Sequence, residues 1–523
     1  MLDRTARVTA TLACALVVGA AGAVPARAQV PEVPGLPDAA VGIMNSAPYS
    51  GANWALRVAD AHTGEVLVDY RSGSLLEPAS VTKTFSSGAA WLTFGPDSRV
   101  ITPVVRTGPV RSGVLRGDLV LVAKGDLTMG GQTAPDGTVV FTDLDHNDAN
   151  LLPGATIADN NPLAGLDRLA RQVKAAGIKE VGGDVVVDDR LWVTEDLGIN
   201  DGPVSPIVIN NNLIDIVASP TRAGQRASIR MRPEVAPWHV VNRTRTVAPG
   251  SRGGIDLEWD DTGRIIVTGR VPVDSQPLLK VVHFDDPATF ARTAFIEALQ
   301  RQGVAINADP VSANSTEGLP ALRTVEGKPR VATLRGLPLA EEATYVLKVS
   351  YNRGAQTFVC RLAATAGSRD CDAGFPVMAD VLRAAGVDPR GASLVDGSGL
   401  PGNFITAETG VALMRAFAAR PDAERWKLAQ PILGVDGSVA AVAADTPAKG
   451  HVYAKTGTLG DADLLNGRLR LEAKALSGYI DAKSGRQLAF TLMVNQGMFD
   501  DIQGVFAANN DLGHIAAEIW AAY

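Results

Sequence analysis

The stretch PASVTKTFSSGAAW, residues 78–91, places a serine three residues before a lysine at the start of an apolar segment. Pro78 suits the entrance of a helix, and the apolar residues that follow would bury that helix. Residues three apart lie on the same face of a helix, so Ser80 and Lys83 become neighbours. The stretch therefore predicts a hydroxyl with an amine beside it.

An S-x-x-K pair alone is a weak signal, because serine and lysine are common surface residues. Ser80 and Lys83 nevertheless form the only such pair in the chain. A serine nucleophile also needs a second polar group for proton transfer and a cation to hold an anionic substrate. Two further stretches fit that need: Ser350-Tyr351-Asn352, and Lys455-Thr456-Gly457-Thr458, which holds the only K-T-G of the sequence.

The second of these motifs has a competitor, since Ser312-Ala313-Asn314 also reads S-x-N. That copy lies among turn-forming residues, whereas Ser350 closes an apolar run. We therefore prefer Ser350.

Length and composition limit the class of protein. The chain has 523 residues, of which 46% are hydrophobic and 20% are charged, so two or three globular domains are expected. The formal net charge of −7 argues against nucleic acid or an anionic lipid surface as the main partner.

Residues 1–28 resemble an export signal. Two arginines precede the apolar run Val8 to Val24, and Ala26-Arg27-Ala28 provides a small-x-small cleavage site. A membrane anchor is the alternative, but glycines and a proline interrupt the run, which is short for a bilayer span. We expect secretion to the periplasm or the cell-wall space, with no stable membrane span in the mature chain.

Removing that segment leaves two cysteines, Cys360 and Cys371, eleven positions apart. An exported protein with this pair can close a small loop by a disulfide. Two buried thiols are the alternative, because the sequence does not supply the geometry that a bridge requires.

The two ends of the chain predict one α+β unit, comprising residues 29–102 and 284–523. Residues 54–60 and 65–70 form one expected strand pair, and residues 474–479 and 487–494 form another, followed by a terminal helix. Between them, residues 103–283 are expected to form an insertion of mostly β character, with room for two nested domains and a helix at 162–176.

One acidic stretch, DLDHNDANLLPG at 143–154, begins like a calcium loop. A calcium-binding EF-hand requires glycine at its sixth position and glutamate at its twelfth, where this chain has Asp148 and Gly154. We interpret it as an acidic solvated loop. No histidine or cysteine has the spacing of a zinc site, and no serine has a G-x-S-x-G frame, so no metal or cofactor is expected.

The three motifs in this order, S-x-x-K, S-x-N and K-T-G, resemble those of penicillin-binding proteins and serine β-lactamases. Three further stretches and the long insertion make the chain similar to the class C low-molecular-mass penicillin-binding proteins, the D-alanyl-D-alanine carboxypeptidase/endopeptidase family: GDLVLVAKGDLTM (117–129), GGDVVVDDRLW (182–192) and VDGSGL (395–400). The chain differs at Tyr351, where the family often has Asp or Asn, and at GDLTM, which replaces G-D-P. The resemblance implies a β-lactamase/transpeptidase-like domain, an antiparallel sheet flanked by helices.

The resemblance also implies the catalytic roles. Ser80 would attack the carbonyl of the penultimate D-Ala of a peptidoglycan stem peptide, and Lys83 would take its proton. Ser350 would pass a proton to the leaving amine, while Asn352 would orient Lys83 and the substrate amide.

Substrate binding is implied in the same way. Lys455, Thr456, Gly457 and Thr458 would hold the terminal carboxylate, and the backbone N–H groups of Ser80 and Thr458 would form an oxyanion hole. Penicillin and other β-lactams would acylate the same serine.

Asp188 is a more ambiguous candidate. The resemblance implies that it faces the free amine of a stem-peptide side chain, whereas a strand-end or capping carboxylate is the alternative. For the whole protein two other functions stay open: a β-lactamase or esterase with the same Ser/Lys pair, and an inactive wall-binding scaffold.

Overall fold

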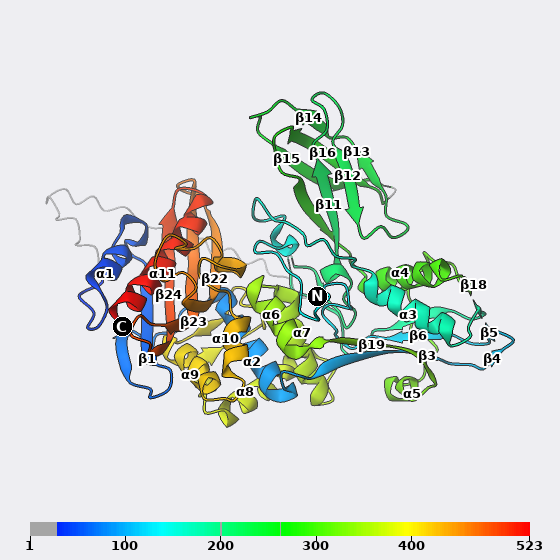
Figure 1. Ribbon diagram of the computed structural model, residues 1–523, viewed down its shortest axis with the longest axis horizontal. Coiled ribbons are helices and arrows are strands. Elements are labelled where there is room, and N and C mark those ends of the chain that lie inside the picture. Colours follow the sequence, from blue (N-terminus) through cyan, green and yellow to red (C-terminus); the bar gives the residue numbers. More distant parts are fainter. Residues whose placement is uncertain (1–28, 199–200, 262) are drawn as a thin grey trace, which may run out of the picture.

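The computed structural model describes residues 29–198, 201–261 and 263–523. The predicted export signal, residues 1–28, lies outside the described residues. Within the described ranges no helix is both long and apolar enough to cross a membrane. We call residues 29–98 together with 339–523 the terminal domain, and residues 99–338 the insertion (Figure 1).

The terminal domain is built on an antiparallel five-stranded sheet that both chain ends supply. Its strand order is β2-β1-β24-β23-β22, so the first strand pairs directly with the last one. The strands are β1 Asn53–Asp60, β2 Val66–Tyr70, β22 Val452–Asp463, β23 Arg468–Asp481 and β24 Gln487–Phe499. The two predicted strand pairs are thus confirmed.

Both faces of this sheet are buried. Along β24, Phe490 and Leu492 contribute to one apolar core, while Ala489 and Met493 contribute to the other, as the period-two alternation of a strand requires. Helices α1 (Asp38–Met44) and α11 (Gln503–Ala522) cover the first face (Figure 1).

Six helices and a short strand pair belong to the opposite side: α2 Lys83–Phe94, α6 Leu339–Lys348, α7 Asn352–Thr365, α8 Gly374–Ala384, α9 Ala407–Ala418, α10 Ala423–Ala429, β20 Ala392–Ser393 and β21 Phe404–Ile405. Helix α2 is buried over most of its length and is followed by Gly95, whose positive φ of 81° glycine adopts without the strain of a side chain.

The insertion is longer than predicted. It starts at β3 (Arg99–Arg106) and ends with β19 (Arg330–Pro338), which pairs antiparallel with β3 in the sheet order β19-β3-β6-β8. Helix α4 (Pro287–Arg301) buries Phe290 and Phe295 in the core of the insertion. The predicted boundary at 283 is therefore wrong, because α4 and β19, which follow it, pack and pair with the insertion and not with the terminal domain.

The insertion consists of an outer part and a nested lobe. Besides β3, β19 and α4, the helices and strands of the outer part are β4 Val110–Arg111, β5 Val114–Leu115, β6 Leu119–Val122, α3 Ala164–Ala175, β7 Glu180–Val181, β8 Val185–Asp188, β9 Glu195–Asp196, β10 Pro203–Val204, β18 Ala305–Ile306 and α5 Leu322–Glu326. Helix α3 lies within the predicted range of 162–176.

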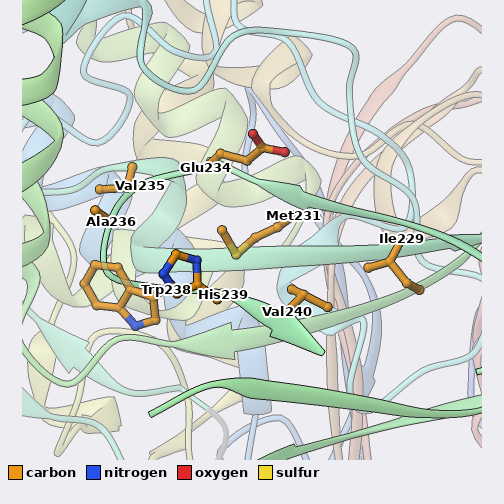
Figure 2. A pocket seen from close by; sticks show the side chains of 8 residues that line it. All are labelled: Ile229, Met231, Glu234, Val235, Ala236, Trp238, His239 and Val240. Carbon is orange, nitrogen blue, oxygen red and sulfur yellow. The ribbon is translucent and has the colours of Figure 1, made fainter. Parts of the chain in front are cut away.

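A nested lobe stands out from this outer part (Figure 1). It contains the sheet β12-β11-β17 and the sheet β13-β16-β14, with β15 paired to β16. The strands are β11 Leu213–Ser219, β12 Ser228–Arg232, β13 Val240–Asn242, β14 Arg245–Val247, β15 Gly254–Trp259, β16 Ile265–Pro272 and β17 Leu278–His283. A cavity of about 390 Å³ opens on this lobe, with Met231, Trp238 and His239 among its lining residues (Figure 2).

Candidate active site

Ser80 and Lys83 meet at the turn that leads into α2. Ser80 lies in a 3-10 turn, Ala79–Thr82, and Lys83 is the first residue of the α-helix. Lys83 Nζ donates to Ser80 Oγ at 2.6 Å and to the carbonyl oxygen of Ser398 at 2.8 Å. The predicted pair of hydroxyl and amine is therefore formed.

The environment of Lys83 favours its neutral form. Its side chain is fully buried, and this burial lowers its pKa to about 8, although the charges of Asp201, Asp396 and Asp148 oppose the shift. Near neutral pH about a tenth of Lys83 is consequently an amine that can accept a proton, far more than for an exposed lysine.

Ser350 lies between α6 and α7 in a left-handed conformation, with φ at 62°. Such a conformation costs a non-glycine residue roughly 1–3 kcal/mol. It presents Ser350 Oγ to Lys455 Nζ, which donates to it at 2.9 Å. The competing Ser312 motif is structural instead, because Asn314 pairs with the backbone of Val187 inside the insertion.

Lys455 is the second fully buried lysine of the site. Burial lowers its pKa well below the usual value; the charges of Lys83 and Lys474 act in the same direction, and Asp148 opposes them. A third lysine, Lys474, was missed by the sequence interpretation. It faces Thr458 across β22 and β23, and its Nζ donates to Thr458 Oγ1 at 2.6 Å.

Two glycines allow the motifs to approach the serine turn. A Cβ on Gly457 would lie 2.0 Å from the carbonyl oxygen of Pro78, and one on Gly399 would lie 1.9 Å from that of Ala79. No larger residue fits at these contacts without a backbone shift. The glycine of K-T-G is therefore a packing requirement of the site.

Among the described residues no hydrogen bond joins Asn352 to Lys83, although the sequence led us to expect that Asn352 orients it. Its Nδ2 donates to both carboxylate oxygens of Asp201, at 2.9 and 3.0 Å. The second partner of Lys83 is the carbonyl of Ser398, whose position in a loop of the terminal domain the sequence did not reveal. Asp201 thereby brings the insertion into the site.

Asp188 lies outside this cluster. Its side chain is fully buried, and its two oxygens accept hydrogen bonds from Arg190 at 2.7 and 2.8 Å. These contacts fit the strand-end carboxylate interpretation, and the implied role toward a substrate amine gains no support from them.

The acidic loop at 143–154 is exposed at both ends but buried at its centre, so the solvated interpretation is wrong for the central residues. Asp145 and His146 are only 4% and 3% exposed. Asp148 is partly exposed. Its charge acts on both Lys83 and Lys455. The residues that bury this loop come from remote parts of the chain, so the local sequence, which is rich in charge, does not predict the burial.

Among the described residues, one trio of potential metal ligands comes together: Glu195, Cys360 and Cys371. The two sulfurs are bonded to each other at 2.01 Å and thus offer no thiolate to a metal. The predicted disulfide is confirmed.

In this site a serine is hydrogen-bonded to a buried lysine, and a second lysine lies on the edge strand of an antiparallel sheet. This arrangement defines a serine hydrolase of the β-lactamase/transpeptidase class. Comparison with known families narrows this class. The chain belongs to the D-Ala-D-Ala carboxypeptidase 3 (S13) family, whose profile matches residues 41–509.

Individual relatives agree with that assignment. The chain is 29% identical over 478 residues to a D-alanyl-D-alanine carboxypeptidase of Actinomadura sp. (strain R39), which covers 87% of this chain and 79% of that protein. It is 21% identical over 473 residues to the D-alanyl-D-alanine carboxypeptidase DacB of Haemophilus influenzae, with 87% of each chain covered.

A solved structure shows the same fold. Penicillin-binding protein 4 (dacB) from Haemophilus influenzae matches with a TM-score of 0.65 and 19% identity, over 92% of this chain and 97% of that one. The predicted family, fold and enzyme class are confirmed.

Proposed function

We propose that this enzyme is a secreted serine D,D-peptidase that cleaves the D-Ala-D-Ala end of peptidoglycan stem peptides through an acyl-enzyme on Ser80. Penicillin would acylate the same oxygen. The observation that carries the proposal is the hydrogen bond between Ser80 Oγ and the buried amine of Lys83, with Ser350 and Lys455 paired opposite them.

In the acylation step, neutral Lys83 accepts the proton of Ser80, and Oγ attacks the carbonyl carbon of the penultimate D-Ala. Ser350 then gives its proton to the amine of the departing D-Ala and takes up the one that Lys83 gained from Ser80, so Lys83 is neutral again. The bond to Lys455 orients the Ser350 hydroxyl for that transfer. The products are an ester on Ser80 and free D-Ala.

The terminal carboxylate of the substrate binds beside Lys455 and Lys474. Lys455, Thr456 and Thr458 offer a cation and two hydroxyls, and Lys474 adds its donor to Thr458. An anion beside Lys455 raises the pKa of that buried amine, so substrate binding restores its positive charge.

The backbone N–H groups of Ser80 and Thr458 form the oxyanion hole for the tetrahedral intermediate. Asn352 commits its amide nitrogen to Asp201, which leaves its side-chain oxygen as the group that accepts from a substrate N–H.

Water then hydrolyses the ester and frees Ser80. A β-lactamase or esterase with the same Ser/Lys pair would differ in the speed of this step. The long insertion favours the peptidase, and the family membership of residues 41–509 agrees with it.

The disulfide between Cys360 and Cys371 supports export, because such bonds persist in oxidising compartments. The segment 1–28 supplies the matching signal in the sequence.

The decisive experiment has two arms. Purified protein is incubated with a fluorescent penicillin, and the labelled peptide is identified by mass spectrometry. In parallel, released D-Ala is measured with a stem pentapeptide that ends in D-Ala-D-Ala. We expect the label on Ser80 together with D-Ala release. An unlabelled protein that releases no D-Ala would overturn the proposal in favour of the scaffold, and rapid penicillin turnover without D-Ala release would favour a β-lactamase.

A further inference from the structure

A short loop, residues 431–439, runs along the outer edge of β22, and we call it the edge loop. Strand β22 is the last strand of the five-stranded sheet, so that sheet leaves one side of it unpaired. Ile432 of the edge loop pairs antiparallel with Tyr453 on this free side. Tyr453 lies two residues before Lys455, so the edge loop begins next to the K-T-G motif.

Farther along, a side chain of the edge loop contacts the motif itself. Ser438 Oγ lies 2.8 Å from Thr456 Oγ1, which is hydrogen-bond distance. The carbonyl oxygen of Ser438 accepts from Asn509 Nδ2, on α11, at 3.3 Å. Thr456 is buried and Ser438 is partly exposed. The serine is therefore held by its backbone while its hydroxyl bonds the threonine.

A buried ion pair joins the edge loop to the end of α6. Lys348 Nζ donates to both carboxylate oxygens of Asp436, at 2.6 and 2.7 Å, and Lys348 is buried. Lys348 precedes Ser350 by two residues, and Asp436 precedes Ser438 by two residues. This single ion pair consequently holds together the segments that carry the two serines.

The residue just before Ser438 is held from two further sides. Gly437 packs against the end of α6, because a Cβ there would lie 2.8 Å from the carbonyl oxygen of Lys348. Its N–H donates to Asp143 Oδ1, in the insertion, at 2.8 Å. The position of Ser438 is thus fixed by contacts with the strand, with α6, with α11 and with the insertion.

We propose that Ser438 is a positioning residue for recognition of the terminal carboxylate of the substrate, and that the ion pair of Lys348 and Asp436 holds it in place. This inference rests on the proposed function, in which Thr456 binds that carboxylate. A hydroxyl has one proton to donate and lone pairs that accept. When Ser438 donates to Thr456 Oγ1, the proton of Thr456 is free to point at the carboxylate, and a hydroxyl that accepts one hydrogen bond donates a stronger one.

The test measures KM and kcat for release of D-Ala from a stem pentapeptide that ends in D-Ala-D-Ala. Ser438→Ala should raise KM about fivefold, the usual effect of losing one hydrogen bond, and should leave kcat within about twofold of the wild type. Ser438→Thr keeps the hydroxyl and should restore a KM close to that of the wild type. The matched control is Thr221→Val, which removes a hydroxyl 3.0 Å from that of Thr246 in the nested lobe and should change neither constant.

Coupling tests whether Ser438 acts through Thr456. The variant Thr456→Val lacks the hydroxyl that Ser438 orients, so adding Ser438→Ala to it should raise KM no further, because residues that act through one contact are not additive.

The ion pair is tested in the same way. Lys348→Met replaces the buried amine by an apolar side chain and should raise KM, with no further rise when Ser438→Ala is added. Asp436→Asn should have the same effect. It changes a partly exposed side chain, so it provides the test if Lys348→Met does not fold.

The possible failures are distinguishable. A wild-type protein that releases no D-Ala would overturn the proposed function. Normal wild-type release with an unchanged KM in Ser438→Ala would overturn the role of Ser438, and so would a fall in kcat alone or a further rise of KM in the Thr456→Val background. An unchanged KM in the folded variants of Lys348 and Asp436 would overturn the role of the ion pair.

Discussion

Lys83 and Lys455 are both fully buried, yet the proposed reaction requires a different protonation state of each. Lys83 must be neutral to take a proton, while Lys455 must be a cation to hold a carboxylate. Burial depresses both pKa values, and the charges of Lys83 and Lys474 lower the pKa of Lys455 further. In the proposed mechanism the substrate resolves this conflict, since a carboxylate bound beside Lys455 would restore the charge on that lysine alone.

Substitution by arginine should therefore have different effects at Lys83 and at Lys455. Lys83→Arg should lower the acylation rate by at least about a hundredfold, because a guanidinium stays protonated and cannot act as the base. Lys455→Arg keeps the charge but changes its shape, so it should mainly raise KM. Single-turnover acylation and steady-state release of D-Ala separate these effects. Near wild-type acylation by Lys83→Arg would require another base, with Ser350 the next candidate.

Ser80→Ala tests the nucleophile directly. The change removes one oxygen from a partly exposed side chain, so the melting temperature should stay close to that of the wild type. Labelling with penicillin and release of D-Ala should both vanish. Turnover above about a tenth of the wild-type value would show that another group attacks the carbonyl.

At the residue scale the sequence predicted the polar groups that the fold brings together in the candidate site. Ser80 and Lys83 are close by helical spacing alone, and Ser350 and Lys455 were identified from their motifs. Lys474 could have been found from the pairing of β22 with β23, since it lies opposite Thr458. Asp148 and Asp201 could not be found in this way, because they reach the site through the fold of the insertion and not through local spacing.

At the scale of elements, the site depends on how closely β22 packs against the turn that carries Ser80. The carbonyl of Pro78 occupies the space that a side chain on Gly457 would need. The edge strand can hold the K-T-G residues beside the nucleophile only because this position is a glycine.

Gly457→Ala should therefore separate the strand from the turn and lower acylation by at least about tenfold, with a loss of stability of about 1–3 kcal/mol from overpacking. Gly460→Ala is the matched control in the same strand, since its Cβ would meet only ordinary contacts at 3.6 Å. Acylation rates and thermal melting of the two variants provide the comparison. Equal effects of both changes would contradict the packing argument.

Sequence patterns predicted the individual helices and strands better than the domain to which each belongs. Strands and helices with clear periodicity were predicted close to their observed positions, as for α3 and β24. The end of the insertion was misplaced because β19 and α4 resemble any other strand and helix. Only their pairing and packing, with β3 and with the core of the insertion, assign them to it.

At the scale of the whole molecule, the disulfide lies where the insertion meets the terminal domain. Cys360, on α7, and Cys371 pack in one buried cluster with Trp192 and Val204 of the insertion. Glu195 of the insertion accepts from Gln356 on α7 at 2.7 Å beside the same bond. The bridge therefore stabilises a helix that carries Asn352 at one end and supports the insertion farther along.

Loss of the bridge should consequently affect stability more than chemistry. Cys360 is eight residues along α7 from Asn352, about 12 Å at the rise of an α-helix, so the motif itself should stay in place. Replacing both cysteines by alanine should lower the free energy of unfolding by about 3 kcal/mol, while acylation of Ser80 by penicillin stays within about threefold of the wild type. Denaturant unfolding of the wild type with and without a reductant separates the effect of the bond from that of the two lost side-chain sulfurs. The reductant should destabilise the wild type and leave the double variant unchanged. A wild type that is equally stable in both conditions would show that the bridge contributes nothing to holding the two parts together.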